Sequence, residues 1–150
     1  MIIYNGSNYQ IGVLPYLSKY THLWHRDYVM DPLMVLSYGG GTQSTAMLYL
    51  VKDGILPKPD IVIHADTGSE MPDTIAFLET AKEVCEEMNI PFVIATSHLG
   101  SLHDYYKSKK TIPMIGVRSC TAKFKIRPQR RLVREIVGSK RGVKLSESWL

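Results

Sequence analysis

The sequence has little cysteine and no long apolar run. Its 150 residues include two cysteines, Cys85 and Cys120. Two cysteines cannot build a disulfide framework, and alone they cannot complete a zinc or iron–sulfur site. No apolar stretch approaches the roughly 20 residues that span a bilayer, and the N-terminus lacks a basic segment followed by an apolar signal core. We therefore expect a cytoplasmic protein without a membrane partner.

The charge is distributed unevenly along the chain. The net charge is +4, but residues 107–150 carry 13 Lys and Arg against 2 acids, which leaves 5 against 12 for residues 1–106. The last third is therefore a surface that attracts anions. Nucleic acid, the phosphates of a nucleotide and an acidic protein would each satisfy it, so charge alone does not select the partner.

Strands and helices alternate after Pro32. With 45% hydrophobic residues, the chain suits one domain over residues 32–150, preceded by an extension over 1–31. Apolar runs predict strands over 33–36, 60–65, 90–95 and 143–145. Amphipathic stretches predict helices over 43–52, 73–89, 102–110 and from Pro128 to before Gly138, with a further short helix over 17–25. This alternation is typical of an α/β fold, a doubly wound, Rossmann-like parallel sheet with helices on both faces.

A glycine-rich loop joins the first of these strands to the first helix. Gly39, Gly40 and Gly41 allow backbone angles that are closed to other residues and let a ligand approach the main chain. The first amides of the next helix have no partner inside the helix, and its dipole favours an anion. The loop therefore predicts a phosphate or sulfate site. It has neither the Gly-Lys-Ser/Thr ending of a Walker loop nor the Gly-x-Gly-x-x-Gly dinucleotide pattern.

Three segments carry a family resemblance. Ser37-Tyr-Gly-Gly-Gly-Thr-Gln-Ser-Thr45 resembles the PP-loop of the adenine nucleotide alpha hydrolase superfamily, Ser-Gly-Gly-x-Asp-Ser, with Gln43 in place of the aspartate. Ala65-Asp-Thr-Gly-Ser-Glu-Met-Pro-Asp-Thr74 resembles the Asp-Thr-Gly-x-x-x-Pro-Glu-Thr signature of phosphoadenosine phosphosulfate (PAPS) reductases. Cys120-Thr-Ala-Lys-Phe-Lys-Ile-Arg-Pro-Gln-Arg-Arg131 is similar to the Cys-x-x-x-x-Lys-[Val/Ile]-x-Pro-x-x-Arg stretch of the same family. The resemblance covers residues 33–136 and points to the PAPS reductase branch.

The resemblance implies a nucleotide site with three walls. The loop that would hold phosphate or sulfate comprises Ser37, Gly39, Gly40, Gly41, Thr42, Gln43, Ser44 and Thr45. The adenosine side would be lined by Asp66, Thr67 and Gly68. The basic wall would be Arg118, Lys123, Lys125, Arg127, Arg130 and Arg131. Guanidinium groups bind such oxyanions in a bidentate fork, although a solvated charged face or a nucleic-acid patch has the same composition.

The resemblance leaves the activity open. The family's catalytic cysteine, or the cysteine set of its iron–sulfur cluster, lies mostly beyond the equivalent of Leu150. We therefore expect the N-terminal part of the family pattern, without an iron–sulfur cluster on this chain alone. Cys120 remains the candidate reactive thiol, because neighbouring cations favour a thiolate, whereas Cys85 on an apolar helical stripe is interpreted as a core residue.

Two hypotheses follow. The chain is either a PAPS reductase or sulfotransferase-like enzyme that binds ATP or PAPS, or a non-catalytic module. Such a module would be a regulator, or one half of a split enzyme, using the same fold and a basic surface that contacts nucleic acid. The expected partners are a thiol donor protein or a second chain that supplies missing elements, and a homo-oligomer stays open. His22, His25, His98 and His103 are interpreted as surface or packed residues rather than metal ligands.

Overall fold

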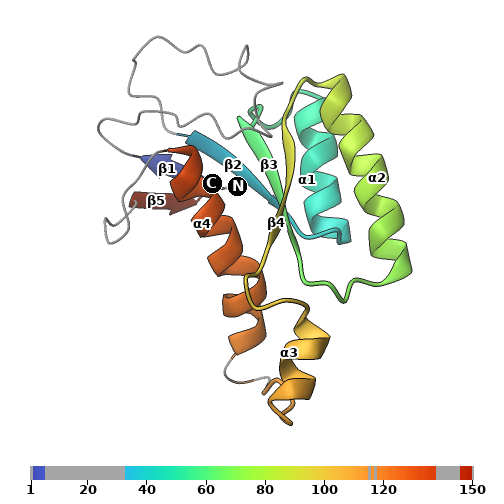
Figure 1. Ribbon diagram of the computed structural model, residues 1–150. Coiled ribbons are helices and arrows are strands. Elements are labelled where there is room, and N and C mark those ends of the chain that lie inside the picture. Colours follow the sequence, from blue (N-terminus) through green and yellow to red (C-terminus); the bar gives the residue numbers. More distant parts are fainter. Residues whose placement is uncertain (1, 6–32, 115, 117, 138–145, 150) are drawn as a thin grey trace.

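A five-stranded sheet lies at the centre of the computed structural model, which describes residues 2–5, 33–114, 116, 118–137 and 146–149 (Figure 1). The strand order is β4-β3-β2-β1-β5. β2 (Leu33–Tyr38), β3 (Ile61–Asp66) and β4 (Phe92–Thr96) are parallel. The predicted parallel α/β sheet is confirmed in these three strands.

The other two strands were not predicted at these positions. β1 (Ile2–Asn5) pairs antiparallel with β2, and β5 (Ser146–Trp149) pairs antiparallel with β1. The sheet is therefore mixed, with β1 inserted between strands that run the other way. The predicted helix over 17–25, with His22 and His25, and the predicted strand over 143–145 fall outside the described residues.

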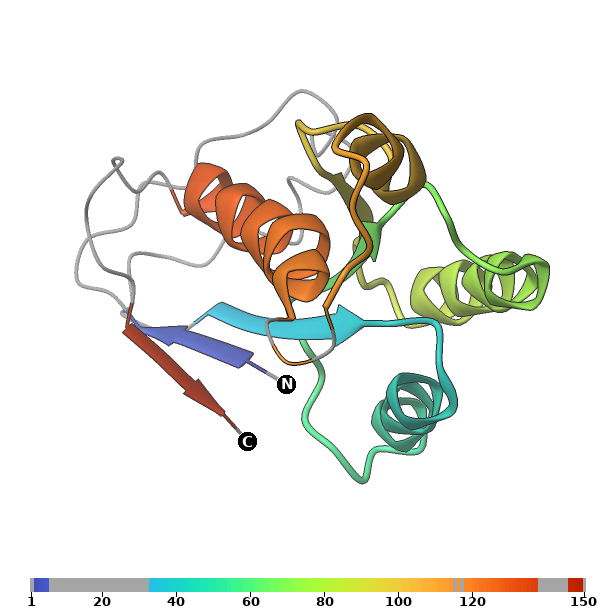
Figure 2. The same cartoon turned by 90° about the horizontal axis from the view of Figure 1, so that it is seen from below.

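Helices cover both faces of the sheet. α1 (Thr42–Lys52) and α2 (Pro72–Glu87) pack on one face, and α4 (Arg127–Ile136) packs on the other (Figure 2). Alternate residues of β2 serve the two layers, since Val35 joins the core under α4 while Leu36 and Tyr38 join the core under α1 and α2. α3 (Leu102–Ser108) lies beyond the carboxyl ends of the strands (Figure 1). None of the described helices is long and apolar enough to cross a bilayer.

The end of α2 explains why the third predicted strand starts too early. Asn89 has a left-handed φ of +53°, and the Ile90 amide donates back to the Cys85 carbonyl at 2.8 Å. This pattern is a Schellman cap. Ile90 is therefore the buried apolar residue of a helix cap, and β4 begins only at Phe92.

The helix predicted to start at Pro128 begins earlier. Helical backbone starts at Ser119, passes through a π-helical turn (Thr121–Ile126) and continues as α4. Pro128 has no amide hydrogen and its ring clashes with the preceding turn of a regular α-helix. A widened turn before the proline accommodates both constraints, and such turns are frequent at functional sites.

Candidate functional site

The candidate site lies at the carboxyl end of β2, in the middle of the sheet. β3 flanks β2 on one side and β1 on the other, and helices from the two faces approach the same strand end (Figure 2). In open α/β sheets, ligands bind in the crevice outside the carboxyl ends of the parallel strands. Both the glycine-rich loop after β2 and the Asp66–Gly68 turn after β3 lie there.

The glycine-rich loop is braced by its own hydroxyl groups. Ser44 Oγ accepts from the Gly39 amide at 3.2 Å and donates to the Gly41 carbonyl at 3.0 Å. Thr45 Oγ1 is 2.9 Å from the Tyr38 hydroxyl. Ser44 and Thr45, predicted as residues of the phosphate-binding loop, form hydrogen bonds within the loop and to Tyr38 in this structure.

Two further features of this loop favour an anion. Gly41 occupies the N-cap of α1, and no side chain caps the first turn. The amides of that turn therefore have no partner from a capping side chain and are available to a ligand. A Cβ built on Gly41 meets nothing within 4 Å, so the space beside these amides is open.

Ser37 ties the loop to the opposite layer of helices. Its side chain points to the α4 side of the sheet, where Oγ donates to Gln129 Oε1 at 2.9 Å. Gln129 belongs to the third matched segment but was not predicted as a site residue. Its amide NH₂ remains a donor close to the end of β2.

His64 on β3 contacts the end of β2, directly before the glycine-rich loop. The imidazole is 2% exposed, and Nδ1 is 3.0 Å from the carbonyl oxygen of Tyr38, the last residue before the glycines. A carbonyl only accepts, so Nδ1 is the donor in this contact. Nε2 is buried and has no partner among the described residues. A buried polar atom without a partner destabilises the fold. The hydrogen bond from Nδ1 to the Tyr38 carbonyl offsets part of that cost.

The turn after β3 is fixed on α3. Asp66 Oδ1 accepts from the Gly68 amide at 2.7 Å, and the Thr67 carbonyl accepts from the Leu102 amide at 2.8 Å. Gly68 has a φ of +66°, and a Cβ there would lie 2.7 Å from Ser101 Cβ. Glycine is therefore required at this contact. The Asp-Thr-Gly segment thus packs directly against the start of α3.

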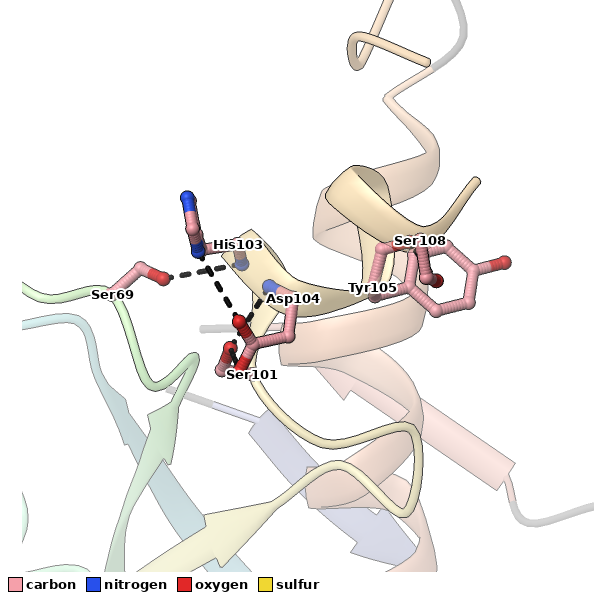
Figure 3. Close-up of polar contacts among 6 residues, drawn as sticks. All are labelled: Ser69, Ser101, His103, Asp104, Tyr105 and Ser108. Atoms are coloured by element: carbon pink, nitrogen blue, oxygen red, sulfur yellow. Dashed lines mark hydrogen bonds and ion pairs between the residues drawn. The ribbon is translucent and has the colours of Figure 1, made fainter. Parts of the chain in front are cut away.

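A serine, a histidine and an aspartate meet at the start of α3 (Figure 3). Ser69 Oγ accepts from the backbone amide of His103 at 3.3 Å, while His103 Nδ1 is 3.3 Å from Asp104 Oδ1. The pKa of Asp104 is lowered, first by the Ser101 hydroxyl and then by His103. Because Ser69 meets the amide and not the imidazole, this group is an N-terminal cap of α3 and not a nucleophile with its base.

One predicted basic residue is anchored at the strand ends. The Lys123 carbonyl accepts from Ser97 Oγ at 3.3 Å, directly after β4, and Lys123 Nζ donates to the Tyr105 hydroxyl at 2.9 Å. Lys123 and Tyr105 are half-buried. Phe124, next in sequence, is fully buried. The π-helical turn therefore holds this lysine in a defined place.

The other predicted cations are more exposed. Arg131 Nε donates to Glu135 Oε1 at 3.0 Å along the solvent side of α4. Exposed pairs of this kind contribute little to stability and leave the guanidinium able to exchange partners. The exposed basic residues are Arg118, Lys125, Arg127, Arg130 and Arg131. Their approach to a ligand stays a prediction.

The two cysteines have different environments. Cys85 lies on the buried face of α2, and burial raises the pKa of its thiol to about 12. Cys120 is half-exposed beside the π-helical turn. Among the described residues, no three His, Cys, Asp or Glu side chains gather as a metal site.

We expect one fast and one protected thiol. At pH 8, a disulfide reagent such as dithionitrobenzoate should modify one cysteine per chain rapidly, and the second only after unfolding, because the thiolate is the reactive form. Cys120→Ser should remove the fast phase, whereas Cys85→Ala should keep it. Rapid modification of the Cys120→Ser chain would contradict this assignment.

Several contacts of the site carry no sequence signal. These contacts join segments that are far apart in the chain, and they involve Gln129, His64, Tyr105 and Thr74. The alternation of β3 indicates which face His64 occupies, but not its bond to Tyr38. A motif identifies the residues that follow the strands, and it does not identify the side chains that support them.

Comparisons with known proteins agree with this geometry. The family model of the phosphoadenosine phosphosulfate reductase domain matches residues 33–141, which include all three walls of the site. No similar curated protein and no similar solved structure was found. The family is one of nucleotide-binding domains, and the parallel strands with the loop after β2 fit it. The chain belongs to the phosphoadenosine phosphosulfate reductase domain family.

Proposed function

We propose that the chain binds an adenine nucleotide that carries a phosphate or sulfate group, with PAPS favoured over ATP. One observation carries the proposal: the uncapped first turn of α1 faces open space beside Gly41, directly after the carboxyl end of β2. An oxyanion placed there would receive backbone hydrogen bonds and the favourable end of the helix dipole. Family membership supports the nucleotide.

Gln43 supports a sulfonucleotide over ATP. It stands where the superfamily pattern has an aspartate, and its exposed amide can orient a ligand or a water but cannot act as an acid or base. A neutral side chain also avoids repelling a highly charged ligand. Pyrophosphate release from ATP is therefore not expected.

Calorimetric titration tests the binding. We expect PAPS and adenosine 3′,5′-bisphosphate to bind, ATP to bind more weakly, and inorganic phosphate to compete at high concentration. A control with guanosine 3′,5′-bisphosphate checks selectivity for the base. The absence of heat or competition with every adenine nucleotide would contradict the proposal.

Turnover is the second part of the proposal. With PAPS and a reduced dithiol protein as electron donor, an enzyme of this family type would release sulfite and adenosine 3′,5′-bisphosphate while the dithiol becomes a disulfide. Cys120 is the thiol that would take part, so Cys120→Ser should abolish sulfite release. Release by the wild-type chain alone would exclude the non-catalytic module.

The alternative is a non-catalytic module that uses the basic surface. The observation behind it is the exposed basic side of the π-helical turn and α4, which attracts phosphates of any origin. If nucleic acid is the partner, its affinity should fall steeply with salt, because each phosphate contact releases a counterion. Nucleotide binding without sulfite release, together with such a salt dependence, would favour this alternative.

A further inference from the structure

We propose that Tyr105 and Lys123 form a two-donor site for a tetrahedral oxyanion, and that Tyr105 is a ligand-contacting residue of the nucleotide site. This inference rests on the proposed function and deepens it. Tyr105 lies on α3, outside the three segments that match the family pattern. No motif therefore assigns it a role.

The hydrogen bond between the two side chains leaves donors available. Lys123 Nζ donates one of its three protons to the Tyr105 hydroxyl, at 2.9 Å. The phenol then acts as the acceptor and keeps its own proton for another partner. Among the described residues, this ammonium contacts the phenol and its ring and forms no ion pair with a carboxylate. Its positive charge is therefore not neutralised within the described residues.

The surroundings of Tyr105 are positively charged. The pKa of Tyr105 is lowered, first by the hydrogen bond from Lys123 and then by the charges of Lys123, Lys109 and Arg127. A phenol with a lowered pKa is a stronger hydrogen-bond donor to an anion. The nearest acid in sequence, Asp104, is directed to Ser101 and His103, while the Tyr105 ring points to another side of α3 (Figure 3).

The pair is held rigidly. The Tyr105 ring packs edge-on against Tyr106 at 5.2 Å and Phe124 at 5.5 Å between centroids. Ser97 fixes the backbone of Lys123 at the end of β4. Preorganised donors lose little entropy when a ligand binds. The aromatic cluster thus presents two donors in a fixed arrangement.

The position suits the far end of a nucleotide. Gln129 contacts Ser37 beside the glycine-rich loop. Lys123 lies six residues before Gln129 on the same continuous helical segment. Six residues at the α-helical rise would span about 9 Å, and the wider π-helical turn makes this separation somewhat shorter. One phosphate or sulfate at the loop and a second at Tyr105 and Lys123 would hold a nucleotide with two separated oxyanions. A ligand such as adenosine 3′,5′-bisphosphate or PAPS has that chemistry.

The test measures by calorimetry the affinities of the wild-type and Tyr105→Phe chains for four ligands with increasing negative charge: adenosine, AMP, adenosine 3′,5′-bisphosphate and PAPS. Phenylalanine keeps the ring and removes the hydroxyl. We expect affinity for the ligands with two oxyanions to fall about tenfold or more, since hydrogen bonds to charged groups are the stronger ones. Adenosine affinity should not change, and Lys123→Met should give a larger loss on the same ligands.

Tyr106→Phe is the matched control, because it also removes a hydroxyl from this aromatic cluster. That hydroxyl lies 2.8 Å from Ser119 Oγ and contacts no cation among the described residues. The variant should leave all affinities unchanged. Ultraviolet titration adds a second measurement: one tyrosine should ionise earlier than the others, and Tyr105→Phe should remove that step.

The outcomes separate the two levels of the proposal. If the wild-type chain binds the ligands and Tyr105→Phe binds each one equally well, the two-donor site is wrong and the nucleotide site stands. A loss that extends equally to adenosine would also overturn the two-donor site, because the hydroxyl would then act through the structure. If the wild-type chain binds none of the ligands, the proposed function fails and this inference fails with it.

Discussion

A Gly40→Ala chain is expected to be less stable by about 2–5 kcal/mol and to lose nucleotide binding. Gly40 has a φ of +72°, which costs other residues roughly 1–2 kcal/mol. The added Cβ would lie 2.6 Å from Thr74 Cγ2, at the start of α2. Relieving such a contact shifts backbone or side chains and typically costs a further 1–3 kcal/mol. Urea unfolding and calorimetric titration measure the two effects.

Two variants separate the causes of this loss. Thr74→Ser removes the methyl group that the added Cβ would meet. The double variant Gly40→Ala with Thr74→Ser should therefore regain the stability lost to the steric contact and keep the loss caused by the left-handed backbone. Gly41→Ala is the matched control, because Gly41 has a φ of −97° and open space around its Cβ. Its stability should change by no more than about 0.5 kcal/mol, while the methyl group should weaken binding of a phosphate at the first turn of α1.

Equal destabilisation by Gly40→Ala and Gly41→Ala would show that the two glycines have the same role and would contradict the assignment. The contrast between them comes from the structure. The sequence presents three consecutive glycines and predicts a turn that binds an anion. It does not show that the second one packs against α2 while the third one faces open space.

The predictable part of the fold is the part governed by local pattern. β3 and α2 follow from a continuous apolar run and from an apolar stripe of helical period, and the structure places them within two residues of the predicted bounds. β1 and β5 are four residues each, and their identity as strands depends on pairing with partners far away in the chain. Short segments of this kind carry too little periodicity to be recognised.

The same distinction applies to the site. Glycines and polar residues after strands are visible in the sequence, because backbone freedom and strand ends have local signatures. The bond from His64 to Tyr38 and the pair of Tyr105 with Lys123 depend on how separate elements pack. The sequence therefore predicts the walls of the site, which stay a prediction, and it does not reveal the side chains that hold those segments in place.

Phe124→Ala should be the most destabilising single truncation in the π-helical turn. Phe124 is 0% exposed and packs against Tyr105 and Tyr106. Truncation of a buried Phe costs about 3–5 kcal/mol, since it removes apolar contacts and leaves a cavity. Phe77→Ala makes the same chemical change at a side chain that is 50% exposed and should cost roughly 1 kcal/mol. Urea unfolding of the two variants gives the comparison.

The effect on binding should extend beyond stability. Phe124→Leu keeps most of the apolar volume, so the fold should survive with a loss of about 1–1.5 kcal/mol. Tyr105 would lose its edge-on contact, and Lys123 would no longer be held in one position at the strand ends. We expect affinity for adenosine 3′,5′-bisphosphate to fall in Phe124→Leu and not in Phe77→Ala, with both chains folded in the assay. If Phe124→Leu binds as tightly as the wild-type chain, the aromatic cluster stabilises the fold without positioning the cation, and the affinity of the site must come from the glycine-rich loop.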